Sequence, residues 1–357
     1  MQSPLALATL ADDDAAPLSR ADAAPLSRAD AAPLSRADAA PLSRADAAAV
    51  GRRLVAGVER VVHGRSAQVR LVTCAVLAGG HVLVEDVPGS GKTTLARAFA
   101  RTLGGELRRI QGTADLLPAD ITGSGVWEPD RRAFSFVPGP LFGHVVLVDE
   151  LNRTPPRTQS AFMEAMEEGA VTVDGRRHVL PDPFVVLATQ NPLEQYGTYP
   201  LPEGQLDRFA VALTLGPNEP AVERRVVREQ LERATVEQMS AVTSPAELAA
   251  VRAESRRTHV ADSVLDHALR VVEATRTHPL VALGASTRAA LVLVRCAQAR
   301  ALLDGRDHVV PDDVKAVAPA VLGHRLQLVD GAGDSSTVRR GQSLVAELLA
   351  QVAVPLA

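Results

Sequence analysis

The sequence of 357 residues predicts an α/β protein, in which helices flank a five-stranded parallel sheet and a smaller, all-helical domain follows. Two observations support this fold class. Short apolar runs bounded by turn residues alternate with helical patterns, an order typical of parallel strands joined by crossover helices. After Gly216 the apolar spacing becomes helical almost to the end of the chain. A chain of this length accommodates two domains with an appendage.

Five apolar runs are the expected strands: residues 81–85, 106–111, 144–149, 184–190 and 210–215. Their near-continuous Val, Leu and Ala content is typical of strands that are buried on both faces of a parallel sheet. Helical spacing precedes the first strand, in residues 54–62 and 66–77. We therefore expect an α/β domain over residues 49–216 and a helical domain over residues 217–357.

An eight-residue repeat, Ala-Asp-Ala-Ala-Pro-Leu-Ser-Arg, fills residues 21–28, 29–36 and 37–44. Its proline interrupts any helix before the chain reaches about 12 residues, the length at which an isolated helix becomes stable. Each repeat has one large apolar residue, so burial cannot offset the entropy of ordering. Residues 1–48 are therefore expected to form a disordered tail, either a neutral tract expanded by duplication or a partner-binding arm.

A glycine-rich loop follows the first predicted strand and precedes a helical segment. The backbone N–H groups of such a loop can surround a phosphate, and the positive N-terminus of the next helix points at it. The chain has lysine at only two positions, and one of them, Lys92, lies here, where a compact ammonium can bridge two phosphate groups. Asp86 stands where the usual pattern has glycine. The expected nucleotide-binding residues are Val87, Pro88, Gly89, Ser90, Gly91, Lys92, Thr93 and Thr94.

Polar residues end two further strands. Asp149 and Glu150 close the run 144–149, at the strand end where parallel sheets bind ligands. We expect Asp149 and the hydroxyl of Thr93 to bind Mg²⁺, and Glu150 to polarise the water that attacks the γ-phosphate of ATP. Asn191, after the run 184–190, can hydrogen-bond both that phosphate and the water.

Further motifs agree with these assignments, and they occupy residues 139–142, 149–153, 155–159, 164–168 and 188–192. On all these motifs the chain resembles the MoxR family of AAA+ ATPases, from about residue 50 to about residue 330. The resemblance implies an AAA+ P-loop NTPase core with a small helical lid, assembled as a ring, usually a hexamer, that binds Mg-ATP between subunits. It also implies ATP hydrolysis coupled to chaperone-like remodelling of partner proteins, typically proteins with von Willebrand A domains.

The same resemblance assigns roles to individual residues. Arg208 matches the arginine finger, which reaches into the neighbouring subunit's site. Arg288 matches the lid arginine called sensor 2, which touches the γ-phosphate in its own subunit, and Arg153 matches a residue that acts across the interface. His63 and Gly64 match the segment that borders the adenine.

Two insertions interrupt the predicted sheet. Residues 115–142 are rich in Gly and Pro, and in the family that the chain resembles this position carries a hairpin. Residues 170–179 alternate around Asp174-Gly175, a strong hairpin signal. The resemblance implies that both insertions face the central opening of a ring, and surface decoration is the alternative.

Composition restricts the function classes. A net charge of -4 offers no attraction to nucleic acid or to an anionic membrane. No apolar run reaches the length of about 18 residues needed to span a bilayer, and a secretory signal is not expected because no basic residue precedes the first apolar stretch. Cys74 and Cys296 lack metal-ligand spacing, so we expect buried free thiols in a cytoplasmic protein. Three alternatives stay open: a magnesium chelatase-like motor subunit, a nucleic-acid motor, and an ATP-binding scaffold with little turnover.

Overall fold

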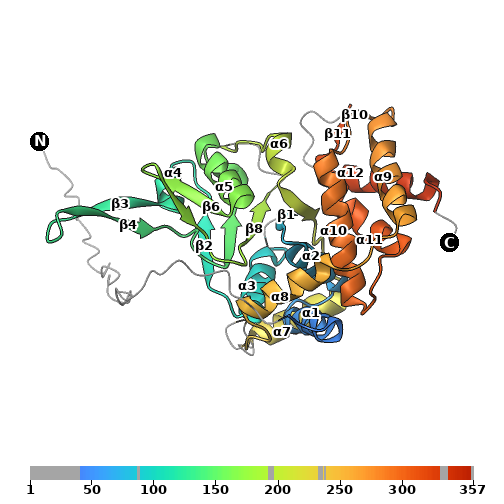
Figure 1. Cartoon of the computed structure of the whole chain (residues 1–357), viewed down its shortest axis with the longest axis horizontal. Helices are drawn as coiled ribbons and strands as arrows, with labels where there is room; N and C mark the ends of the chain where they lie inside the picture. The colour runs from blue at the N-terminus through green and yellow to red at the C-terminus, as the bar shows by residue number, and fades with distance from the viewer. Residues whose placement is uncertain are drawn as a thin grey trace, which may run out of the picture. The chain divides into compact units, whose positions relative to one another are not determined.

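The structure, a computed structural model, describes residues 41–86, 89–191, 197–231, 236, 239–329 and 337–354. The repeats up to residue 40, and with them most of the predicted disordered tail, lie outside the described residues. The fold class predicted from the sequence is confirmed, because a five-stranded parallel sheet is flanked by helices and a helical lid follows it (Figure 1).

The sheet has the strand order β2-β5-β8-β1-β9, and all neighbouring strands run parallel. Its strands begin and end within two residues of the predicted runs: β1 (His81–Glu85), β2 (Leu107–Gln111), β5 (Val145–Asp149), β8 (Val185–Gln190) and β9 (Phe209–Leu213). Three of them, β1, β5 and β9, are buried along their whole length. Because the strands are parallel, the carboxyl ends of β1, β5 and β8 meet at one edge of the sheet.

Two apolar clusters lie on the two faces of the sheet. Along β1, Val82 and Val84 belong to one cluster and Leu83 to the other, as the alternation of side chains along a strand requires. Phe99 packs in the first cluster and Phe162 in the second, so the helices that carry them cover opposite faces. The helices of this part are α1 (Arg44–Glu59), α2 (Ser66–Ala78), α3 (Lys92–Leu103), α4 (Pro118–Thr122), α5 (Pro156–Glu168) and α6 (Glu203–Leu206).

Helix α1 begins inside the segment that the sequence predicts as a disordered tail. The Oγ of Ser43, in the last repeat, accepts a hydrogen bond from the backbone N–H of Asp46 at 3.2 Å and thereby caps the helix. Ala47 and Ala48 are then buried against the core. The tail prediction is therefore wrong for residues 44–48, since repeat composition alone does not reveal that this copy supplies a helix cap.

Both insertions contain β-hairpins. The first pairs β3 (Gly123–Glu128) with β4 (Ala133–Pro138), and it projects from the sheet (Figure 1). The second pairs β6 (Ala170–Val173) with β7 (Arg176–Val179), around a turn in which Asp174 and Gly175 both have positive φ. The rings of Phe136 and His178 stack at 3.8 Å and join the two hairpins. Their orientation toward a ring opening stays a prediction.

The lid consists of six helices and a two-stranded sheet among the described residues. The lid elements are α7 (Pro220–Leu231), α8 (Pro245–Arg256), α9 (Asp262–Thr277), β10 (Val281–Leu283), α10 (Thr287–Leu303), α11 (Pro311–Leu322), β11 (Gln327–Leu328) and α12 (Thr337–Gln351). A short 3₁₀ helix, η3 (Gly323–Arg325), also belongs to the lid, and another, η1 (Leu151–Arg153), lies in the α/β part. None of the described helices is long and apolar enough to cross a membrane.

The lid packs closely against the two helices that precede the sheet. A Cβ on Gly51 of α1 would lie 2.4 Å from Leu303 Cδ2 of α10, so this glycine permits the close approach of the two helices. Arg252 of α8 donates from Nε to the Val76 carbonyl of α2 at 2.8 Å. The predicted domain boundary at 216–217 stays a prediction. Helices α1 and α2, which the prediction assigns to the α/β domain, share one apolar core with the lid.

Candidate nucleotide site

The phosphate loop has the backbone that a phosphate cradle needs. Gly89 and Gly91 have φ of 79° and 96°, and a Cβ on either would meet no atom within 4 Å, so the space beside both residues is open. Lys92, the first residue of α3, follows directly, with Thr93 and Thr94 in the same helical turn. Among the described residues the buried Oγ of Ser90 has no hydrogen-bond partner. This donor and the N-terminus of α3 fit a bound phosphate. Val87 and Pro88 lie outside the described residues.

The structure explains why this loop begins with Asp86 where the usual pattern has glycine. Asp86 is 3% exposed, and its Oδ2 accepts hydrogen bonds from the backbone N–H groups of Leu215 at 2.8 Å and Gly216 at 2.6 Å. Its carbonyl oxygen accepts a bond from Lys92 Nζ at 2.6 Å. Asp86 therefore ties the start of the phosphate loop to the segment that leads from the sheet into the lid.

The acidic pair lies at the same edge of the sheet, where β5 ends. Asp149 Oδ2 accepts from Arg109 Nε of β2 at 2.8 Å. Glu150 has a left-handed φ of 58°, and its backbone N–H donates to Thr189 Oγ1 of β8 at 3.0 Å. Its carboxylate Oε2 accepts from Gln111 Nε2 at 3.2 Å and pairs with Arg153 Nε at 3.1 Å. Neighbouring strands thus fix the direction of both carboxylates.

The donor set suits Mg²⁺ as it occurs beside nucleotides. Mg²⁺ takes one or two protein oxygens and completes its coordination with phosphates and water. The predicted ligands, Thr93 and Asp149, are of this kind. No group of three or more His, Cys, Asp and Glu side chains forms an all-protein metal cage in the described part of the chain, and a nucleotide-bound Mg²⁺ needs none.

The end of β8 completes this edge. The register pairs Glu85 of β1 with Gln190 of β8, and Gln190 Nε2 donates to Glu85 Oε2 at 3.0 Å. Burial raises the pKa of Glu85, although this hydrogen bond opposes the shift. Asn191 follows directly and is 5% exposed. The predicted residues of three different strand ends are therefore brought to one edge of the sheet.

Arg208 and Arg288 lie elsewhere. Both contact the same carboxylate, that of Glu167 at the end of α5, Arg288 through Nη1 at 2.9 Å and Arg208 through Nη1. Burial and the nearby charge of Arg288 lower the pKa of Arg208. Two arginines that the sequence assigns to different sites are thus adjacent in this chain.

Their position relative to the sheet follows from the strand register. Arg208 directly precedes β9, and Phe209 of β9 pairs with His81, the first residue of β1. Arg208 therefore lies at the amino edge, while the phosphate loop follows the carboxyl end of β1. The five residues of β1, at about 3.3 Å each, separate these edges by about 16 Å. The lid places Arg288 beside Arg208 and Glu167, and the predicted contact of Arg288 with the γ-phosphate of its own subunit stays a prediction.

His63 and Gly64 lie under the first helix of the lid. His63 Nε2 and Glu229 Oε2 are 2.6 Å apart, and a Cβ on Gly64, whose φ is 69°, would lie 3.2 Å from the Val222 side chain. Hydrogen bonds from Arg225 and then His63 lower the pKa of Glu229. Helix α7 therefore covers the segment predicted to border the adenine.

The structure also supplies site residues that the sequence did not reveal. Arg109, Gln111 and Thr189 contact the acidic pair, and Glu167 holds the two arginines. Gln111 is the last residue of one predicted strand and Thr189 the second-last residue of another, at the edge predicted to bear polar residues, and this position is a signal that sequence reasoning could have used. Glu167 stands among several acids of one helix and carried no such signal.

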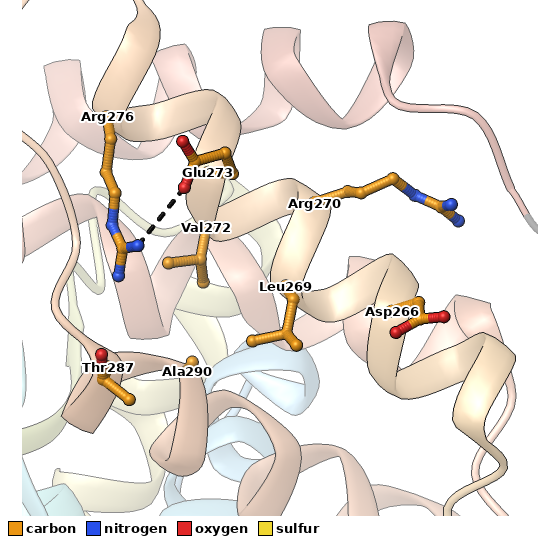
Figure 2. A pocket seen from close by; sticks show the side chains of 8 residues that line it. All are labelled: Asp266, Leu269, Arg270, Val272, Glu273, Arg276, Thr287 and Ala290. Carbon is orange, nitrogen blue, oxygen red and sulfur yellow. Dashed lines mark hydrogen bonds and ion pairs between the residues drawn. The ribbon is translucent and has the colours of Figure 1, made fainter.

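A groove in the lid, separate from these residues, has a cavity volume of about 380 Å³ (Figure 2). It lies between α9 and α10, and an ion pair between Arg276 Nη1 and Glu273 Oε2 at 3.3 Å runs along α9 beside it. Its lining residues are Asp266, Leu269, Arg270, Val272, Glu273, Arg276, Thr287 and Ala290. None of the predicted nucleotide-site residues is among them.

This chain is similar to known proteins in sequence and in fold. Residues 81–211 match the model of the ATPase family associated with various cellular activities (AAA), and residues 273–347 match the AAA lid domain. Chaperone MoxR1 of Mycobacterium tuberculosis is 39% identical over 285 residues, which cover 77% of this chain and 75% of that protein. The chain belongs to the MoxR family of AAA+ ATPases.

Two other known proteins are similar to this chain over most of its length. The uncharacterized protein YeaC of Bacillus subtilis is 43% identical over 304 residues, which cover 85% of this chain and 94% of that protein. The crystal structure of a candidate ATPase from Cytophaga hutchinsonii superposes with a TM-score of 0.79 at 33% identity, over 88% of this chain and 97% of that chain. Nucleotide binding is general in AAA+ ATPases, and the matched residues 81–211 include the phosphate loop described above.

Proposed function

We propose that this chain hydrolyses ATP with Mg²⁺ in a ring of identical subunits and uses the energy to remodel partner proteins. One observation carries the proposal: the carboxyl ends of β1, β5 and β8 bring a phosphate loop, an acidic pair and a buried amide to one edge of the sheet. Phosphoryl transfer to water requires this combination, since the enzyme contributes mainly positioning and charge stabilisation.

The residues at this edge divide the work. Lys92 and the N-terminus of α3 hold the phosphates, and Glu150 orients and polarises the attacking water. Asn191 hydrogen-bonds the γ-phosphate and the water. Mg²⁺ held by Thr93 and Asp149 would neutralise charge on the phosphates.

The contacts of Glu150 keep its carboxylate in place. Gln111 and Arg153 both bind Oε2, and Thr189 binds the backbone N–H of the same residue. A general base held at two points retains its direction while the nucleotide exchanges. Gln111 and Arg153 therefore act as positioning residues for Glu150 in this proposal.

The position of Arg208 supports a site shared between copies. With about 16 Å of sheet between the two edges, Arg208 and Arg288 cannot complete the phosphate site of their own subunit without a large rearrangement. They can do so for an adjacent copy that presents its phosphate loop to this edge. We therefore propose that both arginines stabilise the transition state at a neighbour's γ-phosphate, in a ring of six subunits.

The client is proposed by analogy. A relative at 39% identity is named a chaperone, and the family resemblance points to proteins with von Willebrand A domains.

The two cysteines are free and buried, and burial raises the pKa of Cys74 to about 12, so neither thiol is reactive. We propose that the protein acts in the cytoplasm, where ATP is available.

The test mixes two inactive variants of the full chain. Arg208→Ala and Glu150→Gln should each hydrolyse ATP far more slowly than wild type, since a finger contributes about 10³ to 10⁵ in rate. Mixed rings should regain activity, because the Arg208→Ala subunit supplies an intact site and the Glu150→Gln subunit an intact finger. Absence of recovery in rings verified as mixed would refute the shared site.

A further inference from the structure

A buried arginine of the lid encloses the backbone on both sides of Arg208. Arg325, in η3, has a side chain that is 2% exposed. Its Nε donates to Asp207 Oδ1 at 2.7 Å and its Nη2 to the Asp207 carbonyl at 3.1 Å. Nη2 also donates to the Phe209 carbonyl at 2.7 Å, and Nη1 to the Ala210 carbonyl at 3.3 Å. One side chain thus binds residues before and after the finger.

Chemistry favours arginine for this task. The guanidinium is planar and carries five N–H donors in a fixed arrangement, so it can hold several acceptors in defined directions. Burying a charge is costly unless it is paired and hydrogen-bonded. Burial lowers the pKa of Arg325 and the carboxylate of Asp207 raises it, so the pair offsets that cost. Well-packed apolar side chains could stabilise the fold equally well. We therefore attribute to the Arg325–Asp207 pair a role in holding the backbone from Asp207 to Ala210 in one geometry.

Two neighbours in the lid reinforce the contact. His324 Nε2 and the Phe209 carbonyl are 3.0 Å apart, and burial lowers the pKa of His324 far enough that the imidazole is neutral and donates from Nε2. Ser286 Oγ donates to Asp207 Oδ2 at 3.5 Å. Ser286 caps α10, the helix that carries Arg288. The lid thereby contacts Asp207 from two segments, η3 and the N-terminus of α10, and the second of these carries Arg288.

The finger is fixed at its other end by the core. Glu167 of α5 contacts the guanidinium of Arg208, while Arg325 binds its flanking backbone. A displacement of η3 would move the backbone at Asp207 and Phe209 and draw Arg208 away from this position. The location of the finger therefore depends on the location of the lid.

We propose that Arg325 is a positioning residue for Arg208, through which the lid of one subunit controls hydrolysis at the neighbouring subunit's site. The inference rests on the proposed function, since it presumes ATP hydrolysis at a shared site. It adds that the lid of each subunit influences hydrolysis at the phosphate site of the neighbouring subunit, into which the Arg208 of that lid's own subunit reaches. Nucleotide bound by the same subunit is held by other residues and should be affected little.

The experiment compares Arg325→Lys and Asp207→Asn with wild type. Lysine at position 325 keeps the positive charge but loses the planar array of N–H donors. Asparagine at position 207 keeps the shape of the side chain but loses the negative charge. We expect turnover to fall by about 10²-fold in Arg325→Lys, because misplacement of a catalytic group by about 1 Å has this effect. The affinity of the isolated subunits for a fluorescent ADP analogue should stay within about twofold of wild type.

Mixed rings separate positioning from general damage. A ring of Arg325→Lys and Glu150→Gln subunits should regain turnover, because the first variant offers an intact phosphate site and the second an undisturbed finger. Damage to the variant's own site would leave such rings inactive. The double variant Arg208→Ala/Arg325→Lys should be no slower than Arg208→Ala, since Arg325 acts through the finger.

Arg252→Lys is the matched control. Arg252 is also a buried lid arginine that donates to a carbonyl of another element, but its acceptor is Val76 of α2. It should lose thermal stability and keep its turnover per assembled ring. Where Arg325→Lys does not fold, Asp207→Asn decides, because the Asp207 side chain is 24% exposed and the change leaves Arg325 bound to four backbone carbonyls, those of Asp207, Phe209, Ala210 and Val321.

The outcomes distinguish the two proposals. An inactive wild type, or an Arg208→Ala protein as fast as wild type, overturns the proposed function and this inference with it. A slow Arg208→Ala protein beside fully active Arg325→Lys and Asp207→Asn proteins overturns the inference alone. Failure of Arg325→Lys to recover in mixed rings, where Arg208→Ala does recover, also overturns it.

Discussion

Replacing Asp86 tests whether this carboxylate joins the phosphate loop to the lid. Asp86→Ala removes an acceptor that receives two backbone N–H groups, from Leu215 and Gly216, at 2.8 and 2.6 Å. A hydrogen bond to a charged group contributes about 1.5 to 3 kcal/mol. The residue is 3% exposed, so water cannot readily replace the acceptor, and the two lost bonds predict a loss of at least about 3 kcal/mol in the free energy of unfolding.

The assay is urea unfolding followed by far-UV circular dichroism. Asp86→Asn keeps one oxygen acceptor and loses the charge, so it should lose about half as much free energy as Asp86→Ala. Asp86→Gly, which restores the usual residue of phosphate loops, should also be destabilised. The Asp86 carbonyl that accepts from Lys92 remains in every variant, so nucleotide affinity should change less than stability.

Asp312→Ala is the control for this series, because Asp312 is exposed and its pair with Lys315 at 3.8 Å contributes about 0 to 1 kcal/mol. A loss of less than about 1 kcal/mol in Asp86→Ala would refute the reasoning, since it would mean that the two N–H groups find other acceptors.

Three further predictions concern the site and the sheet. Lys92→Ala should weaken ATP binding by about 30- to 100-fold, the equivalent of about 2 to 3 kcal/mol for a lost charge-assisted contact, measured by titration calorimetry. Glu150→Gln should bind ATP with unchanged affinity and slow its cleavage by about 10²- to 10⁴-fold, which single-turnover assays with radiolabelled ATP would detect. Burial lowers the pKa of His81 from 6.5 to about 4, and its ring accepts from the Val186 N–H through Nδ1 and donates to the Met166 carbonyl. The unfolded chain therefore binds this proton more readily, so the free energy of unfolding is full above pH 6.5 and falls by about 3 kcal/mol as the pH falls toward 4. A His81→Asn protein whose free energy of unfolding falls as steeply with pH as that of wild type would contradict this prediction.

The strands and the phosphate site could be predicted because local chemistry determines them. A run such as Val145–Asp149 is short and has no polar residue before its last position, which favours a buried strand, and the strands begin and end within two residues of the prediction. Parallel strands then bring their carboxyl ends together without further information. Lys92, Asp149 and Asn191 could be assigned to one site on that basis.

The arginines could not be placed in the same way. Arg208 and Arg288 are 80 residues apart in sequence, and nothing in either motif indicates that Glu167 would contact both. The predicted role of Arg288 stays a prediction as well, because it depends on how the lid packs on the sheet. The roles predicted for Arg208, His63 and Gly64 stay predictions, although the structure shows what surrounds each of them.

The sequence by itself determined the order of strands and helices, the phosphate loop and the acidic pair, since each depends on residues close together in the chain. Only the tertiary structure decided which edge of the sheet each arginine occupies and that Asp86 and Arg325 connect the core to the lid. The physical reason is that a buried carboxylate or guanidinium is satisfied by backbone groups of a distant segment, such as Gly216 or Phe209, and backbone groups leave no mark on residue identity.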